Sequence, residues 1–144
     1  MTAKTILVVD DSPVIRKLLR IALSAEGYTV LEAGGAWSAM EAIEEHTPDL
    51  ILQDLILPDM PGTELVRRLH AVCPGVPILA VSGFGAMAAI AGNHHLGFAE
   101  VIAKPIEPSR LVAIVRRYLD QDVSRAPASL VGAAARSPAV ALFP

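Results

Sequence analysis

The chain has 144 residues and a single cysteine, Cys73, so neither an internal disulfide nor a cysteine-based zinc site can form. We expect Cys73 to be a buried small apolar residue. No apolar run reaches the roughly 18 residues that cross a bilayer, and residues 1–4 show no signal-peptide pattern. The net charge of −3 is too mild to suggest direct contact with nucleic acid. These absences favour a soluble, cytoplasmic protein without membrane insertion.

The composition changes near the C-terminus. Residues 1–122 contain sustained apolar patterns, and the overall hydrophobic fraction of 53% is ample for one domain with a core. Residues 123–144 are rich in alanine and proline and keep neither a helical nor a strand period. We predict a single domain over 1–122 and a flexible tail over 123–144. A short docking motif, a helical fragment around 130–136 or the start of a linker to a further domain are the alternatives for the tail.

Strand-like and helix-like patterns alternate through the predicted domain. The strand segments are apolar and β-branched, as in a parallel sheet that is covered on both faces. This alternation predicts a flavodoxin-like, doubly wound, five-stranded parallel sheet of order 2-1-3-4-5 with five helices. We expect strands at 5–10, 28–33, 50–54, 76–82 and 100–103, and helices at 13–27, 36–46, 63–72, 85–95 and 108–120.

Polar side chains follow four of the predicted strands. Asp10 and Asp11 follow the first strand, Asp54 the third, Ser82 the fourth and Lys104 the fifth. In this fold, ligands bind at the carboxyl ends of the strands, so all five side chains should face one crevice. Mg²⁺ uses one or two protein carboxylates with waters and phosphate oxygens, and a further carboxylate can attack phosphorus. The set therefore predicts a phosphoryl-acceptor site, and no serine nucleophile elbow competes with it.

These residues resemble the receiver domain of two-component response regulators. The resemblance runs from Lys4 to Asp122 and includes the loop after Asp54, with Leu57, Pro58 and Gly62 in place. It implies a phosphorylated aspartate, a Mg²⁺ site, a switch hydroxyl and a lysine that is followed by a cis proline. The residues in these roles would be Asp54 as phosphoacceptor; Asp10, Asp11, Asp54 and the Ile56 carbonyl for Mg²⁺; Ser82 and Lys104 beside the phosphoryl group; and Pro105.

The same resemblance implies partners. A histidine kinase or a histidine phosphotransfer protein would supply the phosphoryl group, and a downstream protein target would read the switched surface. A stand-alone receiver is the favoured interpretation, with a weak homodimer possible and no enzymatic activity beyond its own phosphorylation and dephosphorylation. The alternatives are a fragment of a larger regulator, a receiver-like module that is never phosphorylated, and a Mg²⁺-dependent phosphatase. The phosphatase normally needs Asp-x-Asp after the first strand, and this chain has Asp10-Asp11-Ser12.

The chain departs from the receiver pattern at four points. Val101 stands where the family usually has an aromatic switch residue. Ile56 and Phe84 are apolar at positions that, in the family, influence water attack on the acyl phosphate, so the resemblance implies a long-lived phosphoaspartate. Glycines punctuate residues 83–97, which predicts a mobile segment there.

We expect Trp37 to pack over the edge of the sheet, with a partner contact as the alternative.

Overall fold

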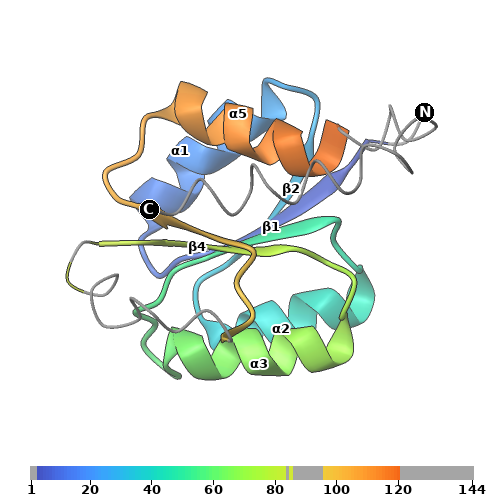
Figure 1. Ribbon diagram of the computed structural model, residues 1–144, viewed down its shortest axis with the longest axis vertical. Coiled ribbons are helices and arrows are strands. Elements are labelled where there is room, and N and C mark those ends of the chain that lie inside the picture. Colours follow the sequence, from blue (N-terminus) through green and yellow to red (C-terminus); the bar gives the residue numbers. More distant parts are fainter. Residues whose placement is uncertain (1–2, 84, 86–95, 121–144) are drawn as a thin grey trace.

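The computed structural model describes residues 3–83, 85 and 96–120. A central parallel sheet separates two layers of helices, with α1 and α5 on one face and α2 and α3 on the other (Figure 1). The strands are β1 (Thr5–Val9), β2 (Thr29–Ala33), β3 (Leu50–Gln53), β4 (Ile78–Ser82) and β5 (Glu100–Ala103). The helices are α1 (Pro13–Ser24), α2 (Ala36–Glu45), α3 (Gly62–Val72) and α5 (Pro108–Leu119).

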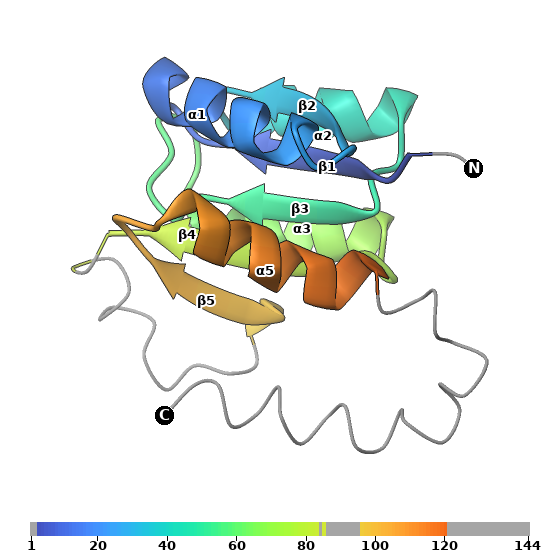
Figure 2. The same cartoon turned by 90° about the horizontal axis from the view of Figure 1, so that it is seen from above.

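The five strands are parallel and lie in the order β2-β1-β3-β4-β5, which confirms the predicted topology (Figure 2). The order reverses between β1 and β3, because the chain first builds outward through β2 and then returns past β1. Ligands bind at such a reversal in open α/β sheets. The site of interest is therefore expected where β1 and β3 end.

Strand β1 shows why this sheet is covered on both faces. Ile6 and Val8 pack with α1 and α5, whereas Leu7 and Val9 pack with α2 and α3. Successive side chains of a strand point to opposite faces, so a continuous apolar run supplies both cores. Helix α1 begins as the sequence predicts, because the Ser12 hydroxyl accepts a hydrogen bond from the Ile15 amide.

Element boundaries differ from the prediction by a few residues. The largest differences are at β4, which begins at Ile78 rather than at residue 76, and at α1, which ends at Ser24. Pro77 has no amide hydrogen and contributes only its carbonyl, which accepts from the Ile51 amide at 3.0 Å. The turn after α1 closes on Gly27, whose φ of +94° is in the left-handed region that glycine tolerates.

Some predictions concern residues outside the described ranges. They include the helix at 85–95, the mobility of that segment and the tail at 123–144.

Trp37 is described, and the expectation that it packs over the sheet edge is wrong. Its side chain is 53% exposed and stacks with the Arg68 guanidinium of α3, 5.5 Å from the ring centre. Cys73 is buried, as predicted. Among the described residues, no helix is both long and apolar enough to cross a membrane.

Candidate functional site

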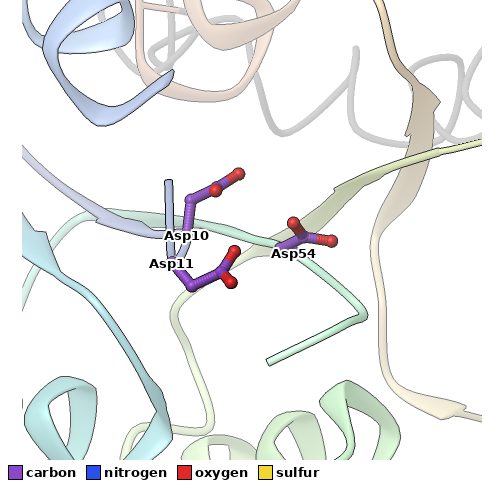
Figure 3. Close-up of side chains that lie close together, drawn as sticks. All are labelled: Asp10, Asp11 and Asp54. Carbon is purple, nitrogen blue, oxygen red and sulfur yellow. The ribbon is translucent and has the colours of Figure 1, made fainter. Parts of the chain in front are cut away.

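Three carboxylates converge at the carboxyl ends of β1 and β3. Figure 3 shows Asp10 and Asp11, which follow β1, and Asp54, which follows β3, with their side chains gathered around one space. One oxygen from each carboxylate lies within 4.8 Å of the other two. Asp10 and Asp54 are buried, whereas Asp11 faces solvent. The cluster thus has a buried floor and an open side.

The register of the two strands sets this arrangement. Val9 is the register partner of Gln53, so the next residues, Asp10 and Asp54, leave the sheet at the same level. The Asp54 amide still donates to the Val9 carbonyl at 2.9 Å, which keeps the two strand ends together. Because this pairing is between strands far apart in sequence, the acids meet only in the folded protein.

The Asp54 carboxylate accepts three hydrogen bonds. Its Oδ1 accepts from the Ser82 hydroxyl at 2.6 Å and from the Ile56 amide at 3.1 Å, and its Oδ2 accepts from Lys104 Nζ at 2.9 Å. Burial acts to raise the pKa of Asp54, but the hydrogen bonds from Ser82, Lys104 and Ile56 outweigh it and lower the pKa. The carboxylate is therefore ionised at neutral pH, as a nucleophile must be.

Lys104 reaches two of the acids from the end of β5. Its Nζ donates to Asp10 Oδ2 at 2.7 Å as well as to Asp54. Burial would lower the pKa of Lys104, but its hydrogen bonds to Asp10 and Asp54 raise the pKa, so the ammonium stays charged. The Lys104–Pro105 peptide bond is cis, and the Lys104 amide donates to the Ser82 carbonyl at 2.8 Å. The hydrogen bond between the Lys104 amide and the Ser82 carbonyl joins the ends of β4 and β5.

The donor set fits a small, hard divalent cation. All candidate ligands are oxygens, which Mg²⁺ prefers, and the open side of the cluster leaves room for waters and phosphate oxygens. Among the described residues, the Asp11 carboxylate has no hydrogen-bond or ion-pair partner. Lys104 supplies one positive charge against three carboxylates, so the cluster retains excess negative charge that a cation would neutralise.

Two supporting contacts were not expected from the sequence. Arg16 of α1 donates from Nη1 to the Asp10 main-chain oxygen at 2.7 Å, and this hydrogen bond fixes the backbone of the acidic pair. Asp59 accepts from the Ala36 and Trp37 amides at 2.8 and 3.0 Å, so the β3–α3 loop caps α2. Neither contact has a local sequence signal, because each joins elements that are brought together by the fold.

Gln53 is different, because its signal is in the sequence. It is a polar residue at the end of the otherwise apolar run Leu50–Gln53, directly before Asp54, and our sequence interpretation gave it no role. Its side chain is fully buried, and Nε2 donates to the Gly62 carbonyl at 2.7 Å.

The positions that depart from the receiver pattern lie as follows. Val101 is half-buried in β5, with Ala80 of β4 as its register partner. Phe98 packs against the apolar cluster on the α2 and α3 side of the sheet. Ile56 is 65% exposed beside the carboxylates. Phe84, the other apolar flanking residue, is outside the described ranges.

Comparison with known proteins identifies the family to which the domain is similar. The profile of the response regulator receiver domain family matches residues 6–116. Among solved structures, a CheY-like receiver domain protein from Methanospirillum hungatei JF-1 superposes with a TM-score of 0.79 at 32% identity, covering 86% of this chain and 99% of that one.

Curated relatives fall into two length classes. Chemotaxis protein CheY of Thermotoga maritima is 30% identical over 117 residues, which cover 79% of this chain and 96% of that protein. The phosphate regulon transcriptional regulatory protein PhoB of Pseudomonas aeruginosa is 37% identical, and the match covers 83% of this chain but only 53% of PhoB. The chain thus spans about half the length of such transcriptional regulators. It belongs to the response regulator receiver domain family of two-component systems and is a phosphoryl-accepting receiver.

Proposed function

We propose that Asp54 is the phosphoacceptor and that a phosphohistidine of a partner protein is the donor. The observation that carries this assignment is the triple hydrogen bonding of the Asp54 carboxylate, which keeps it ionised in a buried position at the centre of the site. Asp10 and Asp11 flank it, but neither is contacted by both a hydroxyl and a lysine. Asp54 is thus the acid with partners suited to receive and hold a phosphoryl group.

In the proposed reaction, an oxygen of Asp54 attacks the phosphorus of the phosphoimidazole. The new O–P bond forms as the P–N bond breaks, and the electron pair of that bond remains on the imidazole nitrogen, which takes up a proton. The products are an acyl phosphate on Asp54 and a neutral histidine. Hydrolysis of the acyl phosphate returns the carboxylate, so the chain catalyses only its own phosphorylation and dephosphorylation.

Mg²⁺ is the proposed cofactor, and bound Mg²⁺ would neutralise charge on the phosphoryl oxygens. Asp10, Asp11, Asp54 and the backbone carbonyl of Ile56 would hold it. Lys104 already contacts Asp54 and stays protonated, so it can transfer its hydrogen bond to the phosphoryl group. The fit of the oxygen donor set supports this assignment.

We propose that Ser82 and Lys104 report the modified state to a protein-binding surface. The Ser82 hydroxyl now donates to Asp54, and it would turn to the phosphoryl oxygens once these are present. The Ser82 carbonyl accepts from the Lys104 amide, so a shift at the end of β4 passes to the end of β5. A downstream protein target would read this change. Val101 is half-buried and has no aromatic ring, so on this route the change must be transmitted without an aromatic rotamer change.

The surface beside the carboxylates is suited to the phosphohistidine-bearing partner. Helix α1 starts two residues after Asp11 and exposes Val14, Leu18 and Ile21, which are 68, 51 and 54% exposed. Such an apolar stripe on one helix face can pack against a helix of the partner. We therefore propose that a histidine kinase or histidine phosphotransfer protein docks across α1.

Incubation with phosphoramidate or acetyl phosphate and Mg²⁺ tests this function. Intact-mass measurement should show the gain of one phosphoryl group, which EDTA and Asp54→Asn both abolish. Asp49→Asn is the matched control, because Asp49 is an exposed acid before β3 whose oxygen accepts from the Thr5 amide, a bond that asparagine can keep. Absence of the mass gain in the wild type with both small donors and the cognate kinase, or its persistence in Asp54→Asn, would overturn the assignment.

A further inference from the structure

Gln53 has an environment that ordinary core packing does not explain. It is the last residue of β3, 0% exposed, and it faces the apolar layer between the sheet and α2 and α3, on the same side as Val9. Its Nε2 donates to the Gly62 carbonyl, which fixes the orientation of the amide, because a carbonyl can only accept. Its Oε1 is buried and has no hydrogen-bond partner among the described residues.

This half-satisfied amide is unfavourable for stability. A buried acceptor without a partner keeps its full desolvation cost, whereas an apolar side chain of the same size would have none. Leucine or methionine would extend the apolar run of Leu50–Gln53 without an orphaned atom. The donor function of the amide is therefore the feature that a replacement would lose, and its partner is the carbonyl of Gly62.

Gly62 closes the loop that carries the phosphorylation site. Its amide donates to the Leu55 carbonyl at 2.9 Å, and Ile56 and Pro61 form an antiparallel bridge across the loop. A Cβ on Gly62 would lie 2.6 Å from the Leu55 Cα, so the two ends of the loop are in direct backbone contact. The Gln53 amide thus holds the returning end of loop 54–62 against the strand from which the loop leaves.

The loop in turn positions the Ile56 backbone at the site. The Ile56 amide donates to Asp54 Oδ1, and its carbonyl is the proposed fourth protein ligand for Mg²⁺. A displacement of Gly62 would pass through the Leu55–Gly62 contact and the Ile56–Pro61 bridge to this backbone. We propose that Gln53 is a positioning residue for phosphoryl transfer, whose buried amide clamps loop 54–62 and so sets the Ile56 backbone against Asp54. This inference rests on the proposed phosphorylation of Asp54.

Gln53→Met tests the role, because methionine is similar in length and cannot donate. The rate of phosphorylation by phosphoramidate is measured against Mg²⁺ concentration, which separates the maximal rate from the Mg²⁺ dependence. Loss of one positioning hydrogen bond should raise the half-saturating Mg²⁺ concentration or lower the maximal rate by about fivefold. The Tm should change little, since removal of the orphaned Oε1 offsets the loss of the hydrogen bond to the Gly62 carbonyl. The amide resonance of Ile56 should shift and its hydrogen exchange should accelerate.

Ile51→Val is the matched control. Ile51 is fully buried in β3, two residues before Gln53 on the same face, and its truncation removes packing without touching the loop. It should lower Tm and leave the phosphorylation kinetics at the wild-type values. A purely structural role of Gln53 could not produce this contrast, in which one variant changes the kinetics at nearly constant Tm and the other lowers Tm at constant kinetics.

Three results would overturn the inference. The first is wild-type kinetics and an unshifted Ile56 amide in Gln53→Met. The second is a fall in Tm as large as that of Ile51→Val with unchanged kinetics per folded molecule. The third is failure of both Gln53→Met and Gln53→Leu to fold, which would make Gln53 a folding residue. The proposed function fails separately, if the wild type itself gains no phosphoryl group at Asp54.

Discussion

Asp11→Asn should stabilise the protein in the absence of divalent cations. Asp11 is exposed and lies with one oxygen within 4.8 Å of oxygens of Asp10 and Asp54. At that separation, one pair of like charges repels by about 0.9 kcal/mol in a water-like dielectric and about 3.5 kcal/mol at an effective dielectric constant of 20. The lower figure suits a solvent-facing carboxylate. Two such repulsions, partly offset by Lys104, give a net gain of about 1 kcal/mol on neutralisation.

Mg²⁺ should reverse this ranking. A ligand that binds only the folded state stabilises it by RT ln(1 + [L]/Kd), which is about 1.4 kcal/mol at ten times Kd. The wild type would gain this amount, whereas Asp11→Asn would lose a charged ligand and gain little. The free energies of unfolding of the two proteins are therefore expected to cross as Mg²⁺ is added.

Urea unfolding followed by circular dichroism checks both halves of this prediction. Measurements at low ionic strength with EDTA should place Asp11→Asn above the wild type, and 0.5 M NaCl should shrink the difference, since exposed charges are screened. Asp49→Asn removes an acid far from the cluster and should shift neither result. If Asp11→Asn is no more stable than Asp49→Asn in EDTA, or if Mg²⁺ stabilises it as much as the wild type, the electrostatic reasoning is wrong.

Three further outcomes are expected. Ile56→Asn should shorten the half-life of phosphorylated Asp54 by about fivefold, because the side-chain amide of the introduced asparagine can orient the attacking water through one hydrogen bond. An unchanged decay of the intact-mass signal would contradict this. Tyr28→Phe removes a 3.1 Å hydrogen bond to Asp120 and should cost about 1 kcal/mol in urea unfolding at pH 7. Burial and then Asp120 raise the pKa of Tyr28 to about 12, so this stability is complete below pH 10 and is lost as pH rises toward 12, where wild type and variant should converge. Asp59→Ala removes the acceptor for two amides of α2 and should destabilise by about 1 kcal/mol. The Trp37 and Ala36 amides lower the pKa of Asp59, so its contribution should persist above pH 4 and vanish as pH falls through the lowered pKa; a difference between Asp59→Ala and wild type that survives at pH 2 would refute it.

The strands and helices follow largely from local patterns. The apolar run at Ile6–Val9 supplies cores on both faces of the sheet, and the Ser12-Pro13 pair starts α1, as local rules predict. The misplaced start of β4 also has a local cause, the missing amide hydrogen of Pro77. Trp37 was misjudged because its exposure depends on α3, where Arg68 offers it a partner. Helix faces are local properties, whereas what covers them is not.

The acidic site was predictable because the order of strands and helices in the sequence shows which residues follow the carboxyl ends of the strands. Parallel strands end at one edge, so residues that follow strands meet there, and Asp10 and Asp54 do so at equal level. The hydrogen bonds that distinguish Asp54 from its neighbours were beyond such a rule. They depend on side-chain rotamers of Ser82 and Lys104, which come from two other strands.

The sequence by itself determined the alternation of elements and the positions of the acids, the hydroxyl and the lysine at strand ends. These depend on side-chain period and on residue order, both of which are written in the chain. Only the tertiary structure decided how Arg16 holds Asp10, how Asp59 caps α2 and how Gln53 clamps the loop at Gly62. Each of these is a contact between elements that touch only after the sheet and its helices have packed, and hydrogen bonds require positions accurate to a few tenths of an ångström.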